Sequence, residues 1–332
     1  MPTPFRAAAV QATPVYLDHD ATVDKTIALI EQAAAQDVQL IVFPETWIPG
    51  YPYWAWLGPP AWGMQWVQRY VAESFEVGSE AETRIRDAAR EHGMHVVLGT
   101  SERAGGSLYM GQLIIDARGE RIAARRKLKP TYIERIVFGE GGGGDLAVHD
   151  TDLGRLGALC CWEHFQPLTK YAMYSMDEQI HAASWPSFTL YPAAYALGPE
   201  LNDAASQMYA AEGGCFVLAA TMPISAEIID MLCDTPDKRE LIRAGGGRSM
   251  IFGPDGSRLA AYLGPEEEGL VVADIDLRVI PLAKAAADPA GHYARPDVTR
   301  LVFDGRPHRP VERAAPAEAP AEEVAEEPEV VS

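Results

Sequence analysis

The residue whose setting most suggests chemistry is Cys161. It lies in the segment LGALCCWEHFQPL, between an apolar run typical of a strand and a run typical of a helix. A turn from strand to helix places a side chain at a sheet edge, where backbone N–H groups can stabilise a thiolate or an oxyanion. The alternative is that Cys160 and Cys161 are small buried apolar residues, as most free cysteines are. Alternation along the chain lets only one of two neighbours face a given side.

Two charged segments could supply a base and a cation. Glu45, in IVFPETW, follows an apolar run and a proline, and burying a carboxylate there is costly unless it has a partner. The alternative is a carboxylate turned outward into solvent. Lys127 and Lys129 lie in ARRKLKPTYIER, where a strand would put both on one face, so periodicity does not choose between them. This basic run also fits a solvated face, in which Glu134 could pair with Arg135 or a lysine.

Two further patterns carry weaker chemical meaning. His164 follows Cys161 by three residues and permits a Cys–His dyad, but a packing or hydrogen-bonding histidine explains it better. The run GEGGGGD at 139–145 lacks both a G-x-G-x-x-G before a helix and the lysine–serine of a phosphate loop. A flexible loop over a site explains this run better than phosphate binding does.

The elements that would position these residues alternate between strand and helix patterns. Short apolar runs predict strands at 5–11, 38–43, 96–100, 108–115, 120–127, 153–162, 179–183, 215–221 and 270–275. Helical spacing predicts helices at 22–36, 65–91, 166–176 and 201–211. The segment 249–262, with GPDG at its centre, predicts a hairpin. This order predicts α/β layers with a mixed sheet, in one domain because no linker precedes about residue 285.

The composition argues against several classes of function. The chain has 332 residues, 48% of them hydrophobic, and a chain of this size buries a core without disulfides or a structural metal. The net charge of −19 argues against a nucleic-acid partner, because phosphate binding needs clustered lysine and arginine. No stretch approaches the roughly 18 apolar residues of a membrane helix, and the N-terminus lacks the apolar core of a signal peptide.

The cysteines and the C-terminal end add two expectations. The four cysteines contain no CxxC pair, which argues against a zinc site, and free thiols fit a reducing compartment such as the cytoplasm. From Val311 onward the chain has seven Glu against one Arg in a Pro- and Ala-rich stretch. We expect 311–332 to be a disordered acidic tail, since it is too poor in apolar groups to pack.

Taken together, the motifs resemble those of the nitrilase superfamily, and in particular its nitrilase branch. The similarity runs from about residue 5 to 303 and rests on IVFPETWIPGYPYW, on RRKLKPTYIER, and on CWEHFQPL followed by QIHAASWP. The resemblance implies a four-layer α-β-β-α sandwich. It also implies that Glu45, Lys127 and Cys161 are catalytic, with Glu134 as a second active-site glutamate. On this basis Lys127 is preferred over Lys129, and the second of the two adjacent cysteines over the first.

The chemistry implied is hydrolysis of an organic nitrile to the carboxylic acid and ammonia, through a cysteine thioimidate and then a thioester. Glu45 would be the general base, Lys127 would stabilise the anionic tetrahedral species, and Glu134 would orient the lysine or a water. No metal or organic cofactor is required. Aromatic side chains could line an apolar pocket for the substrate or pack in the core. The candidates are Tyr51, Tyr53, Trp54, Trp162 and Trp185.

The resemblance also bears on assembly and on the C-terminal end. It implies a homo-oligomer, a dimer or a larger spiral, with a hydrolase domain at 1–284 and an extension at 285–310 that contributes to assembly. GHYARPDV looks like the tail segment of true nitrilases, in which a histidine, here His292, influences activity. The loop GEGGGGDL departs from the GxGDGS common in nitrilases, which leaves its effect on substrate preference open.

Several alternatives remain at this stage. An amidase or carbamoylase of the same superfamily shares the three catalytic residue types, and inorganic cyanide is a further possible substrate. A different class is a non-enzymatic redox protein that uses the vicinal thiols of Cys160 and Cys161. The sequence does not choose among aliphatic, aromatic and arylaceto nitriles.

Overall fold

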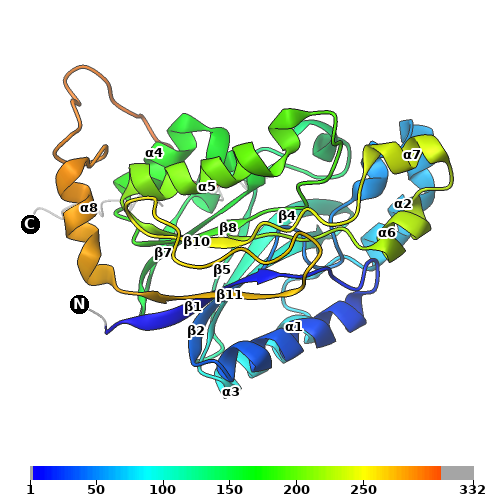
Figure 1. The fold of residues 1–332 in the computed structure, drawn as a ribbon, viewed down its shortest axis with the longest axis horizontal. Helices are drawn as coiled ribbons and strands as arrows, with labels where there is room; N and C mark the ends of the chain where they lie inside the picture. The colour runs from blue at the N-terminus through cyan, green and yellow to red at the C-terminus, as the bar shows by residue number, and fades with distance from the viewer. Residues whose placement is uncertain (1–2, 308–332) are drawn as a thin grey trace, which may run out of the picture.

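Two β-sheets packed face to face form the centre of the molecule (Figure 1). The computed structural model describes residues 3–307. The first sheet has the strand order β11-β1-β2-β3-β4-β5, and the second has the order β10-β9-β8-β7-β6. Strands of the first sheet are β1 (Phe5–Gln11), β2 (Val38–Val42), β3 (His95–Ala104), β4 (Ser107–Ile115), β5 (Arg121–Arg126) and β11 (Gly269–Ile275). Strands of the second are β6 (Val148–Thr151), β7 (Gly154–Cys160), β8 (Ile180–Ser184), β9 (Phe216–Ala220) and β10 (Met250–Phe252).

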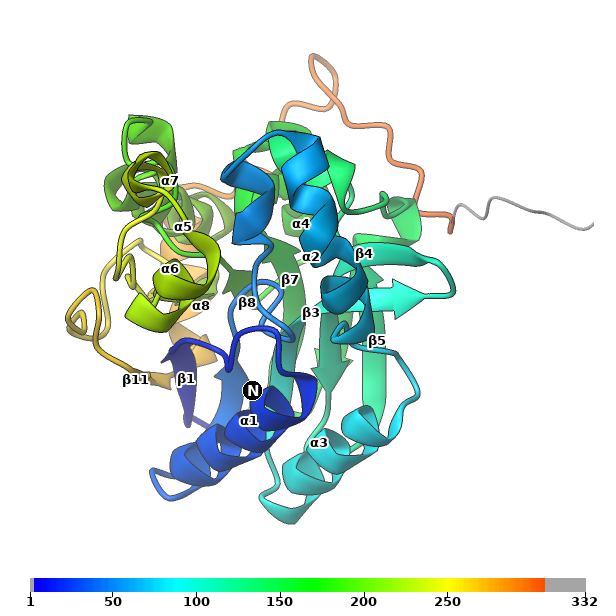
Figure 2. The same ribbon diagram turned by 90° about the vertical axis from the view of Figure 1, so that its right-hand side faces the viewer.

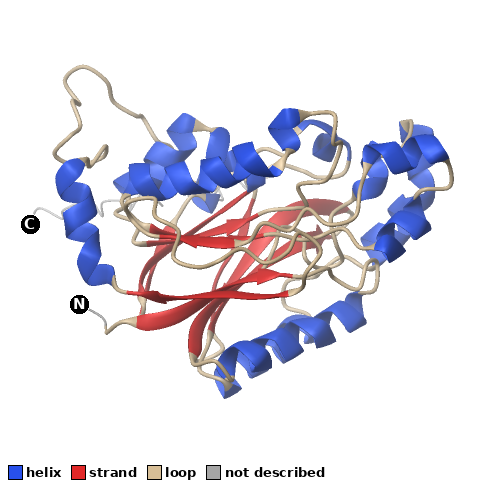
Figure 3. Ribbon diagram, viewed as in Figure 1, coloured by secondary structure: helices blue, strands red, loops and turns tan. Residues whose placement is uncertain are grey.

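Helices cover the outer faces of both sheets, which gives the four layers (Figure 3). The α-helices are α1 (His19–Ala34), α2 (Pro60–Ala72), α3 (Glu80–Glu91), α4 (Pro167–Ser175), α5 (Pro199–Gly213), α6 (Ala226–Leu232), α7 (Pro236–Leu241) and α8 (Ile280–Ala286). In Figure 2, α1 and α3 run alongside each other beneath the first sheet. On the other side, α4 and α5 pack on the second sheet. The predicted α-β-β-α sandwich is confirmed.

Apolar residues between the two sheets form the central core. Ala7, Leu40 and Val97 from the first sheet meet Leu218 and Ile251 from the second, and all five are buried. Strands buried on both faces lose the alternation of apolar and polar residues, which explains the continuous apolar runs in the sequence. Within each sheet parallel and antiparallel pairs coexist, so both sheets are mixed as predicted.

Two predicted elements differ from the structure. The helical stretch predicted at 65–91 is two helices, since α2 ends at Ala72. The second helix begins after Gly78, whose φ is +89°, where the side chain of Ser79 caps α3 by accepting from the N–H of Glu82. The hairpin predicted at 249–262 is reduced to β10 and one isolated bridge between Phe252 and Arg258. Within residues 3–307, no helix is long and apolar enough to cross a membrane.

The ends of three strands carry the chemistry-bearing residues. Glu45 follows β2, Lys127 follows β5, and Cys161 follows β7. Close approach is needed here, since a Cβ on Gly99 of β3 would lie 1.9 Å from the carbonyl oxygen of Pro44. Only glycine allows this contact, so β3 holds the segment before Glu45 in place.

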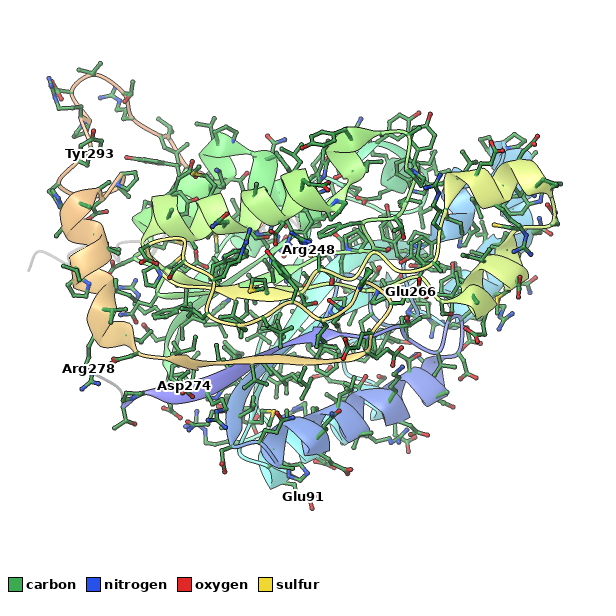
Figure 4. The ribbon with its side chains drawn as sticks, viewed as in Figure 1. Glu91, Arg248, Glu266, Asp274, Arg278 and Tyr293 are labelled. Atoms are coloured by element: carbon green, nitrogen blue, oxygen red, sulfur yellow. The ribbon has the colours of Figure 1, made fainter. Side chains whose placement is uncertain are left out.

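The chain beyond α8 runs over the surface without regular structure. Figure 4 labels Tyr293 on this segment, and its ring is 70% exposed. The predicted assembly extension at 285–310 falls largely on this stretch. The predicted acidic tail at 311–332 lies outside the described residues.

Candidate active site

Cys161 occupies a sharp turn between a strand and a helix. It directly follows β7 and opens a short 3₁₀ turn, η4 (Cys161–Phe165), that leads into α4. Its φ is +47°, a left-handed conformation that is unfavourable for a residue with a Cβ. This turn aims Cys161 into a cavity, whereas Cys160 is fully buried and lies beside Arg125, with 3.9 Å between Sγ and Nη1. Of the two adjacent cysteines, Cys161 alone lines the cavity.

A buried ammonium joins two carboxylates next to this sulfur. Nζ of Lys127 lies 2.9 Å from Oε1 of Glu45 and 2.8 Å from Oε2 of Glu134. A carboxylate oxygen of Glu45, one of Glu134 and Sγ of Cys161 all lie within 4.8 Å of one another. The structure therefore brings together the four residues that the sequence singled out. The other candidate, Lys129, is exposed and pairs with Glu140.

A metal ion would compete with this lysine. Two carboxylates and a thiol within reach of one another are a possible ligand set. The ammonium of Lys127, however, already binds both carboxylates. A cation could enter only by displacing it, so these residues do not fit a resident metal.

The charges in the cluster do not balance, and this affects Glu45. Burial, together with the nearby charge of Glu134, raises the pKa of Glu45 to about 8, although Lys127 opposes the shift. Burial disfavours the charge on Lys127, but the two carboxylates outweigh it and its pKa lies well above the ordinary value. One cation thus faces two buried carboxylates, and Glu45 is the carboxylate whose affinity for a proton is raised.

Glu45 has one oxygen free for chemistry. Within residues 3–307, its Oε2 has no hydrogen-bond partner, while Oε1 accepts from Lys127. Burial raises the pKa of the Cys161 thiol well above its ordinary value, and Glu45 adds to this effect. The resting sulfur is therefore a neutral thiol, and it needs a base to become a nucleophile.

Glu134 is held in place by its own turn. It lies in the 3₁₀ turn η2 (Tyr132–Ile136), where its carboxylate accepts from the backbone N–H of Thr131 at 2.5 Å. The hydroxyl of Tyr51 donates to its other oxygen at 2.9 Å. With Lys127 added, both oxygens of Glu134 are bonded, which suits a group that orients the lysine.

An apolar cavity of about 660 Å³ opens over the sulfur. Seven of the twenty residues that line it are aromatic, and Glu134 is the one charged residue among the described residues that form it. The aromatic members are Tyr51, Trp56, Tyr132, Trp162, Trp185, Phe188 and Tyr191. Three of the predicted substrate-binding residues, Tyr51, Trp162 and Trp185, thus line the cavity.

Trp54 and Tyr53 do not line this cavity. Both lie in the 3₁₀ turn η1 (Tyr53–Trp56) and are buried. The ring of Trp54 packs edge-on against Tyr70, with 5.8 Å between centroids, and belongs to the core beside α2. Trp56, two positions along the same tight turn, faces the cavity instead. Trp56 is a cavity residue that the sequence does not indicate, because periodicity cannot be read across so short a turn.

His164 does not act on the sulfur. Its Nδ1 lies 2.6 Å from the carbonyl oxygen of Cys161, and its Nε2 lies 2.9 Å from Nε2 of His181. Both ring nitrogens are hydrogen-bonded elsewhere, so His164 is a hydrogen-bonding histidine and not the partner of a Cys–His dyad. His292 is 63% exposed, near Asp288, and is not among the residues that line the cavity.

The basic run 125–135 is only partly a solvated face. Arg125 is 5% exposed and forms a bidentate ion pair with Glu163. Burial opposes the charge on Glu163, but Arg125 holds the pKa of this carboxyl below its ordinary value. Glu163 also accepts from the backbone N–H groups of Cys160 and Leu128, which adjoin the sulfur and the buried lysine. No sequence pattern indicates this pair, because its members are remote in the chain.

The glycine-rich loop has a packing explanation. A Cβ on Gly143 would lie 1.8 Å from the carbonyl oxygen of Asp304, and one on Gly141 would lie 2.6 Å from the carbonyl oxygen of Arg126. The loop is therefore pressed between the strand that leads to Lys127 and the C-terminal segment. Its N–H at Gly141 also donates to the carbonyl of Lys127 at 2.8 Å. It is a packed connection close to the active site.

Comparisons with known proteins identify the family of this chain. A sequence model of the family described as "Carbon-nitrogen hydrolase" matches residues 6–285. A protein named "Nitrilase" from Pseudomonas syringae pv. syringae is 61% identical over 92% of both chains. An "Aliphatic nitrilase" from Rhodococcus rhodochrous is 53% identical over 93% of this chain and 85% of its own, and a "Nitrilase, arylacetone-specific" from Alcaligenes faecalis is 51% identical over 98% and 92%.

The fold also matches a solved structure. An amidase from Nesterenkonia sp. superposes with a TM-score of 0.61 at 21% identity, covering 85% of this chain and 94% of the amidase. At that identity the likeness concerns the fold alone. The family match extends over most of the chain, and the relatives exceed half identity over nearly all of it. The chain therefore belongs to the carbon–nitrogen hydrolase family.

Proposed function

We propose that this hydrolase is a nitrilase, which converts an organic nitrile to the carboxylic acid and ammonia. The observation that carries the proposal is the cluster of Glu45, Lys127 and Glu134 around the Cys161 sulfur, at the base of an apolar cavity. The relatives named as nitrilases support the choice of substrate class. Cys161 is the nucleophile, Glu45 the general base, Lys127 the stabilising cation and Glu134 the residue that holds the lysine.

The first half of the reaction ends with the release of ammonia. Glu45 takes the thiol proton as the sulfur attacks the nitrile carbon, which gives a covalent thioimidate. Glu45 then directs a water at the same carbon, and a tetrahedral species forms. Lys127 stabilises the negative charge that develops there, since a fixed cation acts strongly where water is excluded. Collapse of this species expels ammonia and leaves an acyl thioester.

The second half returns the free enzyme. A second water, again activated by Glu45, attacks the thioester carbon and releases the carboxylic acid and the Cys161 thiol. Each proton that Glu45 takes is passed on within the cycle, to the leaving nitrogen or to the sulfur. The protein's own acid, base and nucleophile supply every step of this sequence.

A nitrile and its matching amide separate this function from that of an amidase. Purified protein supplied with phenylacetonitrile is expected to release ammonia, and phenylacetamide is expected to be the poorer substrate. Fast release from the amide with none from the nitrile would instead favour an amidase.

The rate should depend on pH through Glu45. The base must be ionised to accept the thiol proton, and burial raises its pKa to about 8. We therefore expect kcat/KM to rise with pH through this value and to fall as the solution becomes more acidic. The pH profile of kcat/KM measures this. A profile that stays flat down to the ordinary range of a carboxylate would contradict the role of Glu45.

The cavity wall favours neutral nitriles with a bulky apolar group. Replacing Trp56 by leucine is expected to raise KM for phenylacetonitrile about tenfold, because part of the apolar contact with the substrate is lost. The matched control is Trp54→Leu, which lies in the same turn but packs on Tyr70. Steady-state kinetics and thermal melting distinguish them: Trp54→Leu should lower the melting temperature and leave KM unchanged. The opposite pattern would mean that the wall is assigned incorrectly.

Assembly and location also belong to this proposal. Copies of the chain associate into a homo-oligomer, a dimer or a larger spiral. The support is the apolar exposure near the C-terminal end, where Leu282 is 79%, Tyr293 70% and Val302 87% exposed. The extension at 285–310 would take part in that contact. The cytoplasm suits the four free cysteines.

A further inference from the structure

A hydrogen-bonded series of buried polar side chains leads away from the nucleophile, and none of its four members lines the cavity. Its members are His164, His181, Glu178 and Tyr209, and none is more than 2% exposed. The hydrogen bonds along it measure 2.6 Å from His164 to the Cys161 carbonyl, 2.9 Å between the histidines, 2.7 Å from His181 to Glu178 and 2.6 Å from Tyr209 to Glu178. The proposed mechanism uses none of these groups. Burying such polar groups without hydrogen-bond partners would be costly, so their pairing needs an explanation.

The bonding partners fix where the protons lie. A carbonyl oxygen only accepts, so Nδ1 of His164 carries a hydrogen. Burial and the neighbouring His181 hold the pKa of His164 well below its ordinary value, so this ring is neutral and its Nε2 is a bare acceptor. Nε2 of His181 must therefore donate. One further proton is shared between Nδ1 of His181 and Glu178, and the hydroxyl of Tyr209 donates to the other carboxylate oxygen.

Close contacts with the backbone and with neighbouring rings hold these four side chains in place. A Cβ on Gly157 of β7 would lie 1.9 Å from Oε1 of Glu178, so only glycine at this position admits the carboxylate. The ring of Tyr209 stacks on His181, with 3.9 Å between centroids. On the other side Trp185, a wall of the cavity, stacks on His164 at 5.0 Å. Glu178 thus holds His181, and His181 holds His164 with its Nδ1–H donor at the Cys161 carbonyl.

The carbonyl of Cys161 and the N–H of Trp162 belong to one trans peptide group, so they point in opposite directions. His164 holds the carbonyl end. At the other end, the Trp162 N–H acts on the Cys161 side chain and lowers the pKa of its thiol, although burial and Glu45 raise that pKa more strongly. Fixing the carbonyl therefore fixes the whole peptide group next to the sulfur, including the direction of its N–H. Without the His164 donor, this peptide could rotate away from a conformation that is already unfavourable at Cys161.

We propose that His164, held by His181 and Glu178, is a positioning residue: it fixes the peptide group after Cys161, and with it the turn that carries the sulfur and the adjacent Trp162 N–H. The N–H then stabilises the thiolate as the proton leaves. The proposal rests on the proposed function only in taking Cys161 as the nucleophile. Its effect can be measured on the thiol itself, with no nitrile present.

The test compares His164→Leu with His164→Asn by the rate at which iodoacetamide alkylates Cys161, followed by peptide mass spectrometry across pH. Asparagine keeps a donor near the place of Nδ1, and leucine does not. We expect leucine to slow alkylation about tenfold and to move its pH midpoint upward, with asparagine within about threefold of the unchanged protein. Glu45, Lys127 and Glu134, the charged groups that face the sulfur, are the same in both variants.

Steady-state kinetics should follow the alkylation rates. His164→Leu should lower kcat about tenfold, with KM changed by less than about threefold. A folded leucine variant that alkylates at the unchanged rate and pH midpoint would overturn the proposal and leave His164 a packing residue. A folded asparagine variant as slow as the leucine variant would overturn it as well. Loss of nitrile turnover with unchanged alkylation differences would instead count against the nitrilase function alone.

Glu178, at the other end of the hydrogen-bonded series from Cys161, supplies a second variant. In Glu178→Gln, the amide can donate to Nδ1 of His181 and accept from Tyr209, so the donor at Nε2 of His181 is kept. We expect this variant to alkylate within about threefold of the unchanged protein. A loss of about tenfold in a folded Glu178→Gln variant would contradict the assigned proton positions, because charge and not the pattern of donors would then be what matters.

Discussion

Replacing Cys161 with alanine should abolish the release of ammonia from a nitrile, by at least about 10⁴-fold, because no other group can form the covalent intermediate. Cys161 is the one cysteine among residues 3–307 that lines the cavity. Alanine fills most of the same space at this turn, so the fold should persist. Ammonia release measures the loss, and thermal melting verifies that the variant is folded.

Cys160→Ala is the matched control. This neighbour is fully buried beside Arg125 and points away from the cavity. Its replacement should leave kcat nearly unchanged and at most lower the melting temperature. Equal losses of activity in the two variants would contradict the nucleophile assignment and favour a protein that works through both vicinal thiols.

Replacing Glu45 with glutamine should lower kcat/KM by about 10³-fold, the size expected for loss of a general base. The amide has the shape of the carboxylate but cannot take the thiol proton. The ion pair of Lys127 with Glu134 at 2.8 Å remains to hold the ammonium, so the cluster should keep its geometry. Steady-state kinetics with a nitrile, together with the alkylation rate of Cys161, measures the effect.

Another buried carboxylate provides the control for this variant. Glu82 on α3 is 1% exposed and pairs with Arg121, remote from the cavity. Glu82→Gln should destabilise the fold without lowering kcat. If Glu45→Gln retained most of its activity, a different base would be required, and both oxygens of Glu134 are already bonded.

Residues next to each other in the sequence show where prediction from the sequence reaches its limit. Periodicity does not distinguish Lys127 from Lys129, and only the resemblance to a family separates them. The structure supplies the physical reason: β5 ends at Arg126, so the alternation that would place both lysines on one face stops there. Lys127 turns inward to the carboxylates, and Lys129 reaches solvent.

Contacts between residues remote in the chain cannot be predicted from the sequence pattern. Arg125 looked like part of a solvated basic face, yet it is buried against Glu163 because a carboxylate from a remote turn meets it there. Trp54 and Trp56 look alike in the sequence, and a tight turn sends one to the core and the other to the cavity. Most strands and helices are predictable, because they follow from apolar patterns within short segments, whereas the four-layer arrangement with two sheets is implied only by the family resemblance. The partners of buried polar groups follow from the tertiary fold.

Peptide mass spectrometry of the protein after brief mixing with phenylacetonitrile tests the central claim most directly. The account predicts that the peptide containing Cys161 gains the mass of the nitrile or of its acyl group, on Cys161 and not on Cys160. The adduct should disappear as the substrate is used up and should be absent from Cys161→Ala. Product formation with no adduct on Cys161, or an adduct on another residue, would contradict the account.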